Sequence, residues 1–120
     1  MAGLPPLNDI LEDYDLLDAE DRYRLLIELG RSLEPMPDAL KTDATRVRGC
    51  AASVWVYPQR AEDGRLHVLA DSNAAITKGI VALVLSAVQD QPANEVAQMD
   101  IAAALAPFEL SRQIEELRDH

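Results

Sequence analysis

The first third of the chain carries apolar residues at helical spacing. Between residues 7 and 17 they recur at every third or fourth position, which predicts a helix with Asn8 as a candidate cap. Asp18 can cap a second helix, in which the spacing continues to Leu33. The segment Glu34-Pro35-Met36-Pro37 ends it, because each proline disfavours helical backbone in the residue before it.

The middle of the chain predicts extended structure. Residues 46–48, 53–57 and 65–70 are expected to be extended, and Asp63-Gly64 is a hairpin turn signal between the last two. On 53–57 both the odd and the even positions are apolar, so we expect both faces of this strand to be partly covered.

The last third returns to helical spacing. Residues 73–88 form the most apolar predicted helix, and residues 109–120 predict a polar one. Candidate caps and first-turn residues are Asp71 or Ser72 for the apolar helix, and Pro92 and Asp100 for two helices that precede Pro107. The order of helices, small antiparallel sheet and helices predicts an α+β fold, with a three-stranded sheet packed against helices.

Length and composition limit the number of domains, the localisation and the classes of partner that we expect. A chain of 120 residues supports one domain. No apolar run reaches the roughly 18 residues that cross a bilayer, the N-terminus lacks a signal peptide, and a single cysteine cannot form an internal disulfide. These features predict a soluble cytoplasmic protein. A net charge of -10 argues against nucleic acid and anionic membranes as partners; it favours solubility first and a basic partner surface second.

The only cysteine, Cys50, lies in the stretch TRVRGCAASVWVY. Arg46 and Arg48 are a local source of positive charge, which favours the reactive thiolate. Gly49 permits backbone angles that would expose the sulfur. Lone cysteines are nonetheless mostly buried as small apolar residues, so the residues alone leave both interpretations open.

Elimination narrows the chemistry of Cys50. A cysteine hydrolase needs a histidine base, and the two histidines are His67, inside a predicted strand, and His120. No spacing matches a metal site, a phosphate loop or a dinucleotide fingerprint. A thiolate that attacks an already activated sulfur, such as a persulfide on a partner enzyme, needs no base of its own. The sequence permits this step but does not require it.

Three segments carry a family resemblance. They are RYRLLIELGRSLEPMP, RVRGCAASVWV and LHVLADSNAAITKGIVALVL. Together they resemble the SufE family of sulfur acceptors, which includes the CsdE-type proteins. The match covers about positions 8 to 108. The ordered series that carries it is Tyr23, Glu28, Leu29, Gly30, Gly49, Cys50, Ser53, Val54, Trp55, Asp71, Ser72 and Gly79.

The resemblance implies a function and a fold. SufE-like proteins bind a pyridoxal-phosphate cysteine desulfurase (SufS/CsdA-like), accept its sulfane sulfur on one cysteine, and pass it to an iron–sulfur scaffold complex (SufBCD-like). By position Cys50 is that acceptor, supported by Arg46, Arg48 and Gly49 in its loop. The expected fold is SufE/IscU-like, with the cysteine loop beside a hydrophobic cavity. The acceptor itself carries no cofactor and no metal.

The sequence departs from the family pattern in three places. Ala51 and Asn73 stand where many members have Gln and Asp. The ending ELSRQIEELRDH does not match the family's C-terminal segment, so we expect a single SufE-like domain over 1–120 in which either this member is short or the sequence omits residues. The alternative function is a desulfurase-binding regulatory module in which Cys50 is structural; an independent cysteine hydrolase is more distant.

Overall fold

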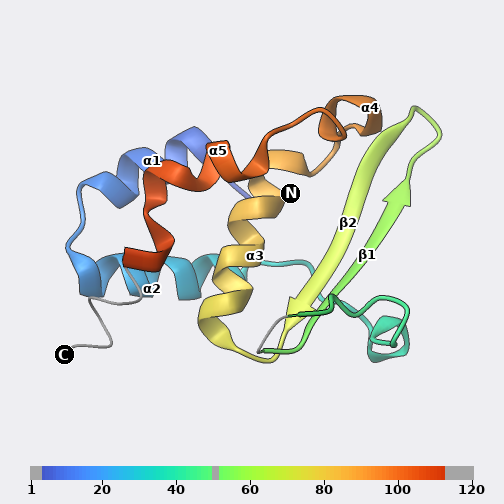
Figure 1. Cartoon of the computed structure of the whole chain (residues 1–120), viewed down its shortest axis with the longest axis horizontal. Coiled ribbons are helices and arrows are strands. Elements are labelled where there is room, and N and C mark those ends of the chain that lie inside the picture. The colour runs from blue at the N-terminus through green and yellow to red at the C-terminus, as the bar shows by residue number, and fades with distance from the viewer. Residues whose placement is uncertain (1–3, 50–51, 113–120) are drawn as a thin grey trace.

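The computed structural model describes residues 4–49 and 52–112. The elements occur in the order helices, hairpin, helices (Figure 1), and the predicted α+β fold is confirmed. In chain order they are α1 (Leu7–Asp15), α2 (Ala19–Arg31), the 3-10 turn η1 (Asp38–Leu40), β1 (Val54–Arg60), β2 (Arg65–Ser72), α3 (Ala75–Val88), β3 (Gln91–Pro92), α4 (Ala93–Val96), α5 (Ile101–Leu105) and the 3-10 turn η2 (Ala106–Phe108).

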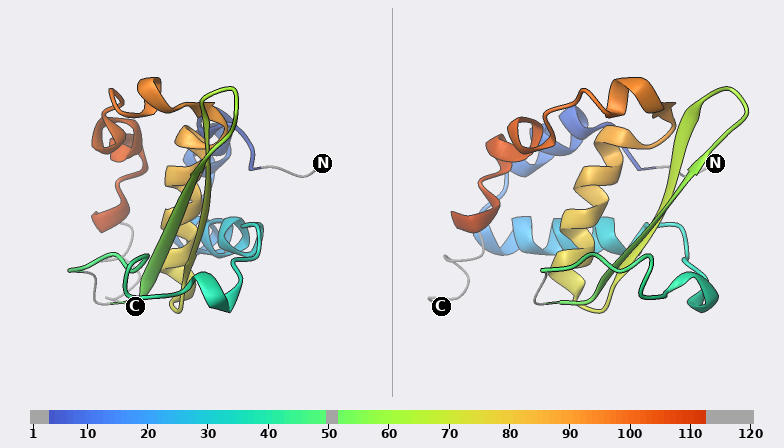
Figure 2. Two further views of the ribbon diagram at one scale, coloured as in Figure 1. Left: turned by 90° about the vertical axis from the view of Figure 1, so that its right-hand side faces the viewer. Right: turned by 45° about the vertical axis from the view of Figure 1, so that its right-hand side comes forward.

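The apolar helix α3 is the centre of the molecule. The β1–β2 hairpin stands along one side of it and α2 crosses it (Figure 2). The crossing is close because two glycines meet there: a Cβ on Gly30 would lie 2.9 Å from the backbone nitrogen of Gly79, and a Cβ on Gly79 would collide with the Leu26 carbonyl. Side chains of α1, α2, β2 and α3 form one buried cluster with Phe108.

The N-terminal helix is fastened to the C-terminal part of the core by one aromatic pair. Tyr14 and Phe108 are both almost fully buried, and their rings meet edge to face with centroids 4.9 Å apart. The Tyr14 hydroxyl donates a hydrogen bond of 2.7 Å to the Phe108 carbonyl. A buried hydroxyl needs such a partner, so this bond allows tyrosine to fill a core position.

The sheet has three antiparallel strands, but the predicted third strand was wrong. β1 and β2 pair from Val54 opposite Ser72 to Arg60 opposite Leu66. The third strand is β3, which pairs with the other edge of β2. The predicted strand at 46–48 makes only an isolated bridge, between Arg46 and Trp55.

Two of the predicted helix caps are confirmed and two are wrong. The carboxylates of Asp18 and Asp100 accept hydrogen bonds from backbone N–H groups in the first turns of α2 and α5. Asn8 is not a cap, because α1 starts one residue earlier, after Pro6. For α3, Asp71 and Ser72 belong to β2 and the cap position is Ala74. Of the predicted final helix, residues 110–112 are helical and 113–120 lie outside the described residues.

Candidate functional site: the cysteine loop

The segment around the cysteine, residues 48–53, is called the cysteine loop here. The residues just before and just after it are joined by backbone hydrogen bonds. Cys50 and Ala51 lie outside the described residues, but the chain on both sides is described. The Val47 N–H donates 2.8 Å to the Val54 carbonyl, and the Val56 N–H donates 2.8 Å to the Thr45 carbonyl. These bonds bring the two arms of the loop together at the end of the hairpin opposite the Asp63-Gly64 turn (Figure 1).

The C-terminal arm of the loop is held by the end of β2. Ser53 donates its backbone N–H to Asn73 Oδ1 at 3.0 Å, and its carbonyl accepts from the Asn73 N–H at 3.2 Å. The same carbonyl accepts from the Ser72 hydroxyl at 2.8 Å. Ser72 is buried, which keeps this contact away from competing water. Asn73, a departure from the family pattern, is therefore part of the loop's anchor.

The N-terminal arm ends at a left-handed glycine. Gly49 has φ +85°, a conformation that costs a residue with a side chain about 1–2 kcal/mol. A Cβ at this position would have no neighbouring atom within 4 Å. Backbone conformation alone, and not crowding, therefore favours glycine before Cys50.

The predicted supporting arginines lie exposed on the same arm. Arg46 Nη2 donates to the Ser53 hydroxyl at 3.2 Å, so it joins the two arms. Arg48 and Gly49 line one pocket of about 390 Å³ with Arg46. Its remaining lining residues are Asp43 and Val47. Three of the five are charged, so this pocket differs from the hydrophobic cavity that the family resemblance implies beside the cysteine.

A charge cluster that the sequence did not reveal lies beside the Val54–Ser72 end of the hairpin. Asp71 is mostly buried, with 17% of its side chain exposed, and it bonds two lysines: Lys41 at 2.8 Å and Lys78 at 3.2 Å. Burial acts to raise the pKa of the Asp71 carboxyl, but hydrogen bonds from Lys41, the Ser72 N–H and Lys78 outweigh it and hold the pKa below 3.8. The hydrogen bond to Asp71 raises the pKa of Lys41.

The charge cluster connects the segment before the cysteine loop, which contains Lys41, to the β1–β2 hairpin. Lys41 lies just after η1, its ammonium is 5.5 Å from the centroid of the Trp55 ring, and Trp55 pairs with Asp71 across the sheet. Trp55 is only partly buried and contacts this lysine. No pattern pointed to the cluster, because Lys41 and Asp71 are far apart in the chain and Asp71 resembled a helix cap.

His67 lies too far along β2 to serve the loop as a base. It is five residues from Ser72, which is roughly 16 Å along a strand. Its Nδ1 is 2.9 Å from Asp90 Oδ1 and its Nε2 is 2.9 Å from Glu34 Oε1. These hydrogen bonds, to Asp90 and then to Glu34, raise the pKa of His67 above 6.5. Both ring nitrogens are engaged in hydrogen bonds with carboxylates, which agrees with a structural histidine.

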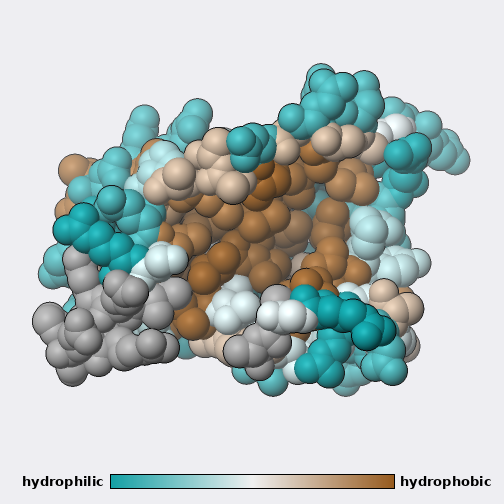
Figure 3. All heavy atoms as spheres, viewed as in Figure 1, coloured by the Kyte–Doolittle hydropathy of each residue, from teal (hydrophilic) through white to brown (hydrophobic). Residues whose placement is uncertain are grey.

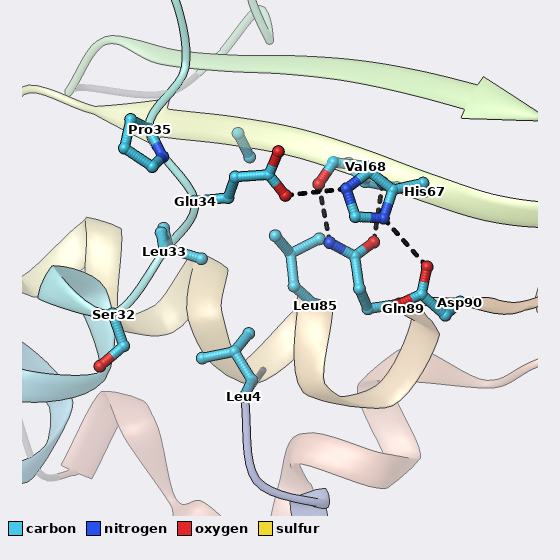
Figure 4. A pocket seen from close by; sticks show the side chains of 11 residues that line it. Leu4, Ser32, Leu33, Glu34, Pro35, His67, Val68, Leu85, Gln89 and Asp90 are labelled. Atoms are coloured by element: carbon cyan, nitrogen blue, oxygen red, sulfur yellow. Dashed lines mark hydrogen bonds and ion pairs between the residues drawn. The ribbon is translucent and has the colours of Figure 1, made fainter. Parts of the chain in front are cut away.

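A second pocket, of about 450 Å³, lies beside His67 (Figure 4). Leu33 and Leu85 contribute apolar walls, and Gln89 closes one side by bonding both the N–H and the carbonyl of Val68. Its lining residues on β2 are His67, Val68 and Ala70, in the middle of the strand. Figure 3 shows another apolar area, gathered over α3 below α5.

Within the described ranges, no three His, Cys, Asp or Glu side chains group in a way that could hold a metal ion. Among the helices of the same ranges, none has the length and apolar character needed to cross a membrane.

The fold and the site define a small α+β protein in which the described residues on either side of the one cysteine, Gly49 and Ala52, belong to segments held together at the end of a hairpin. The family described as "SufE: Fe-S metabolism associated domain" matches residues 8–120. The chain therefore belongs to the SufE family, as the sequence motifs indicated.

Similar proteins agree with this membership. An uncharacterized SufE-like protein of Rhizobium meliloti is 40% identical over 98 residues, which is 78% of this chain and 70% of that protein. The sulfur acceptor protein CsdE of Escherichia coli is 36% identical over 99 residues, 82% of this chain and 67% of CsdE. A solution structure of a hypothetical protein from Thermus thermophilus has the same fold, with a TM-score of 0.61 at 18% identity over 98% of this chain and 100% of that one.

Proposed function

We propose that this protein accepts sulfur from a pyridoxal-phosphate cysteine desulfurase on Cys50 and delivers it to an iron–sulfur cluster assembly scaffold. The observation that carries the proposal is that the SufE match spans the chain's only cysteine. The described segments before and after that cysteine are bonded to each other and to the end of β2. The similar CsdE is named a sulfur acceptor protein, which supports the same role here.

The proposed chemical step is an exchange between two sulfur centres. The Cys50 thiolate attacks the outer sulfur of a persulfide on the desulfurase. A new S–S bond forms at Cys50, the S–S bond of the donor breaks, and the donor cysteine leaves as a thiolate. The transferred sulfur keeps its proton, so neither an external base nor an oxidant is needed. This agrees with His67 being engaged elsewhere by Glu34 and Asp90.

The residues around Cys50 have distinct proposed roles. Arg46 joins the arms of the loop through Ser53. Arg48 adds positive charge, which favours a thiolate nearby. Gly49 supplies a backbone conformation that lets the loop change direction, as a hinge for engagement with the donor enzyme. The pyridoxal phosphate belongs to the donor, and the acceptor needs none.

We treat the chain as one SufE-like domain, since its buried cluster extends from Ile10 to Phe108. We also place it in the cytoplasm, where a lone thiol stays reduced and available for transfer.

The proposal is tested by mixing the protein with a cysteine desulfurase and cysteine and measuring its intact mass. We expect added sulfur on the wild type and none on Cys50→Ser. If Cys50→Ala stimulates desulfurase turnover as well as the wild type does, Cys50 is structural and the protein is a regulatory module instead.

A further inference from the structure

Two arginines beside the cysteine lack acidic partners in a strongly acidic protein. The chain has 21 Asp and Glu residues against 11 Lys and Arg. Across residues 4–49 and 52–112, no ion pair joins Arg46 or Arg48 to a carboxylate. Lys41, a few residues earlier, has two such partners, Asp38 and Asp71. The positive charge next to Cys50 is therefore left available.

The surroundings of these arginines form a receptor for a small anionic group. The pocket of about 390 Å³ is lined by Asp43, Arg46, Val47, Arg48 and Gly49, all of them exposed. Arg46 is tied to Ser53, which leaves its position fixed by the loop. Arg48 makes no hydrogen bond with the residues that the structure describes. Val47, with 39% of its surface exposed, adds an apolar contact at the same place.

We propose that this pocket receives a carboxylate side chain of the cysteine desulfurase, with Arg48 as the residue that binds it. The inference rests on the proposed function and adds the chemistry by which the donor enzyme is recognised. A guanidinium offers several donors in a planar fork that matches a carboxylate, and such pairs fix orientation as well as position. Because Arg48 is two residues from Cys50 in the chain, its ion pair with the donor's carboxylate fixes how the cysteine segment is positioned on the donor enzyme.

The net charge makes this contact selective. A protein of charge -10 is repelled by acidic surfaces everywhere except where positive charge is locally exposed. The Arg46–Arg48 arm is such a place, so an acidic site on the donor is met by this arm and not by the acidic residues of α1 and α2. Complementary charge of this kind governs orientation and specificity more than total affinity.

The test compares two arginines on the same protein. Arg48→Glu changes the proposed contact. Arg60→Glu makes the same charge change at an exposed position of β1, at the hairpin end remote from the loop. Binding of each variant to a purified pyridoxal-phosphate cysteine desulfurase is measured by calorimetry without cysteine, so that no sulfur moves. Thermal melts verify that both variants are folded.

We expect Arg48→Glu to weaken binding at least tenfold, Arg48→Lys to recover part of the loss, and Arg60→Glu to stay within twofold of the wild type. Equal weakening by Arg48→Glu and Arg60→Glu would show that only overall charge matters and would overturn the inference. So would unchanged binding of Arg48→Glu. Failure of the proposed function has a different signature: the wild type binds the desulfurase but takes up no sulfur on Cys50 when cysteine is added.

Discussion

Ser53 and Asn73 hold each other through two hydrogen bonds: the Ser53 N–H donates to Asn73 Oδ1 at 3.0 Å, and the Asn73 N–H donates to the Ser53 carbonyl at 3.2 Å. One residue ends the cysteine loop and the other follows β2. The exit of the loop is therefore held by the end of β2, while its entry, bonded to Val54 through Val47, turns at the left-handed Gly49. This asymmetry gives the first two predictions.

Replacing Asn73 by Ala should release the exit of the loop. The side-chain oxygen that accepts from Ser53 is lost, and we expect a stability loss of about 0.5–1.5 kcal/mol, the usual worth of one hydrogen bond. Amide hydrogen exchange at Ser53 should speed up with it. Asn73→Asp keeps an acceptor oxygen and serves as the control. Equal exchange in wild type and Asn73→Ala would mean that this bond does not hold the loop.

Gly49→Ala and Gly64→Ala form a matched pair. Both glycines have positive φ, +85° and +82°, and a Cβ at either would meet no atom within 4 Å. Each substitution should cost about 1–2 kcal/mol of stability through backbone strain alone. Only Gly49→Ala should also slow sulfur uptake on Cys50 from a desulfurase. A similar slowing in Gly64→Ala would trace the effect to stability and not to the loop.

Asp71→Asn should weaken the contact between the segment that contains Lys41 and the β1–β2 hairpin. The charge-assisted bonds to Lys41 and Lys78 are lost. We expect the free energy of unfolding, measured by urea denaturation at pH 7, to fall by about 1.5–3 kcal/mol. The pKa of Asp71 is depressed on folding, so its contribution is complete above pH 3.8 and is lost as the pH falls through the lower folded-state pKa. The stability difference between wild type and Asp71→Asn should shrink in that acidic window, and a pH-independent difference would contradict this account.

His67 should make the stability depend on pH in the opposite sense. Its pKa is raised by Asp90 and Glu34. Its contribution to the free energy of unfolding is therefore fully present below pH 6.5 and is lost as the pH rises through the higher folded-state pKa. His67→Gln should remove this slope, and an NMR titration of the His67 ring should give a midpoint above 6.5. Because the ring lies far along β2 from the loop, sulfur uptake should be unaffected by His67→Gln; a loss of uptake with the fold intact would revive a catalytic role.

The sequence predicts local features of this fold better than distant pairings. Asp18 and Asp100 were recognised because a cap and its helix are adjacent in the chain, and Asp63-Gly64 because a tight turn has its own residue chemistry. β3 was missed, since two residues, Gln91 and Pro92, carry no periodicity. Whether a short extended run pairs fully depends on its neighbours, so residues 46–48 could not be told from a strand.

The site shows the same limit. Cys50, Arg46, Arg48 and Gly49 lie within one short stretch and could be selected from the sequence. The anchors of the loop could not: Asn73 and Ser72 meet Ser53 only because the hairpin folds back, and Asp71 meets Lys41 from a distant part of the chain. Hydrogen-bond partners of this kind follow from tertiary structure and leave no pattern in one sequence.

The most direct test of the proposed function is the intact mass of the protein after incubation with a cysteine desulfurase and cysteine, followed by treatment with a reductant. The account predicts sulfur added to wild type, removed by the reductant, and absent from Cys50→Ser. Sulfur added equally to wild type and Cys50→Ser, or to neither, would contradict it.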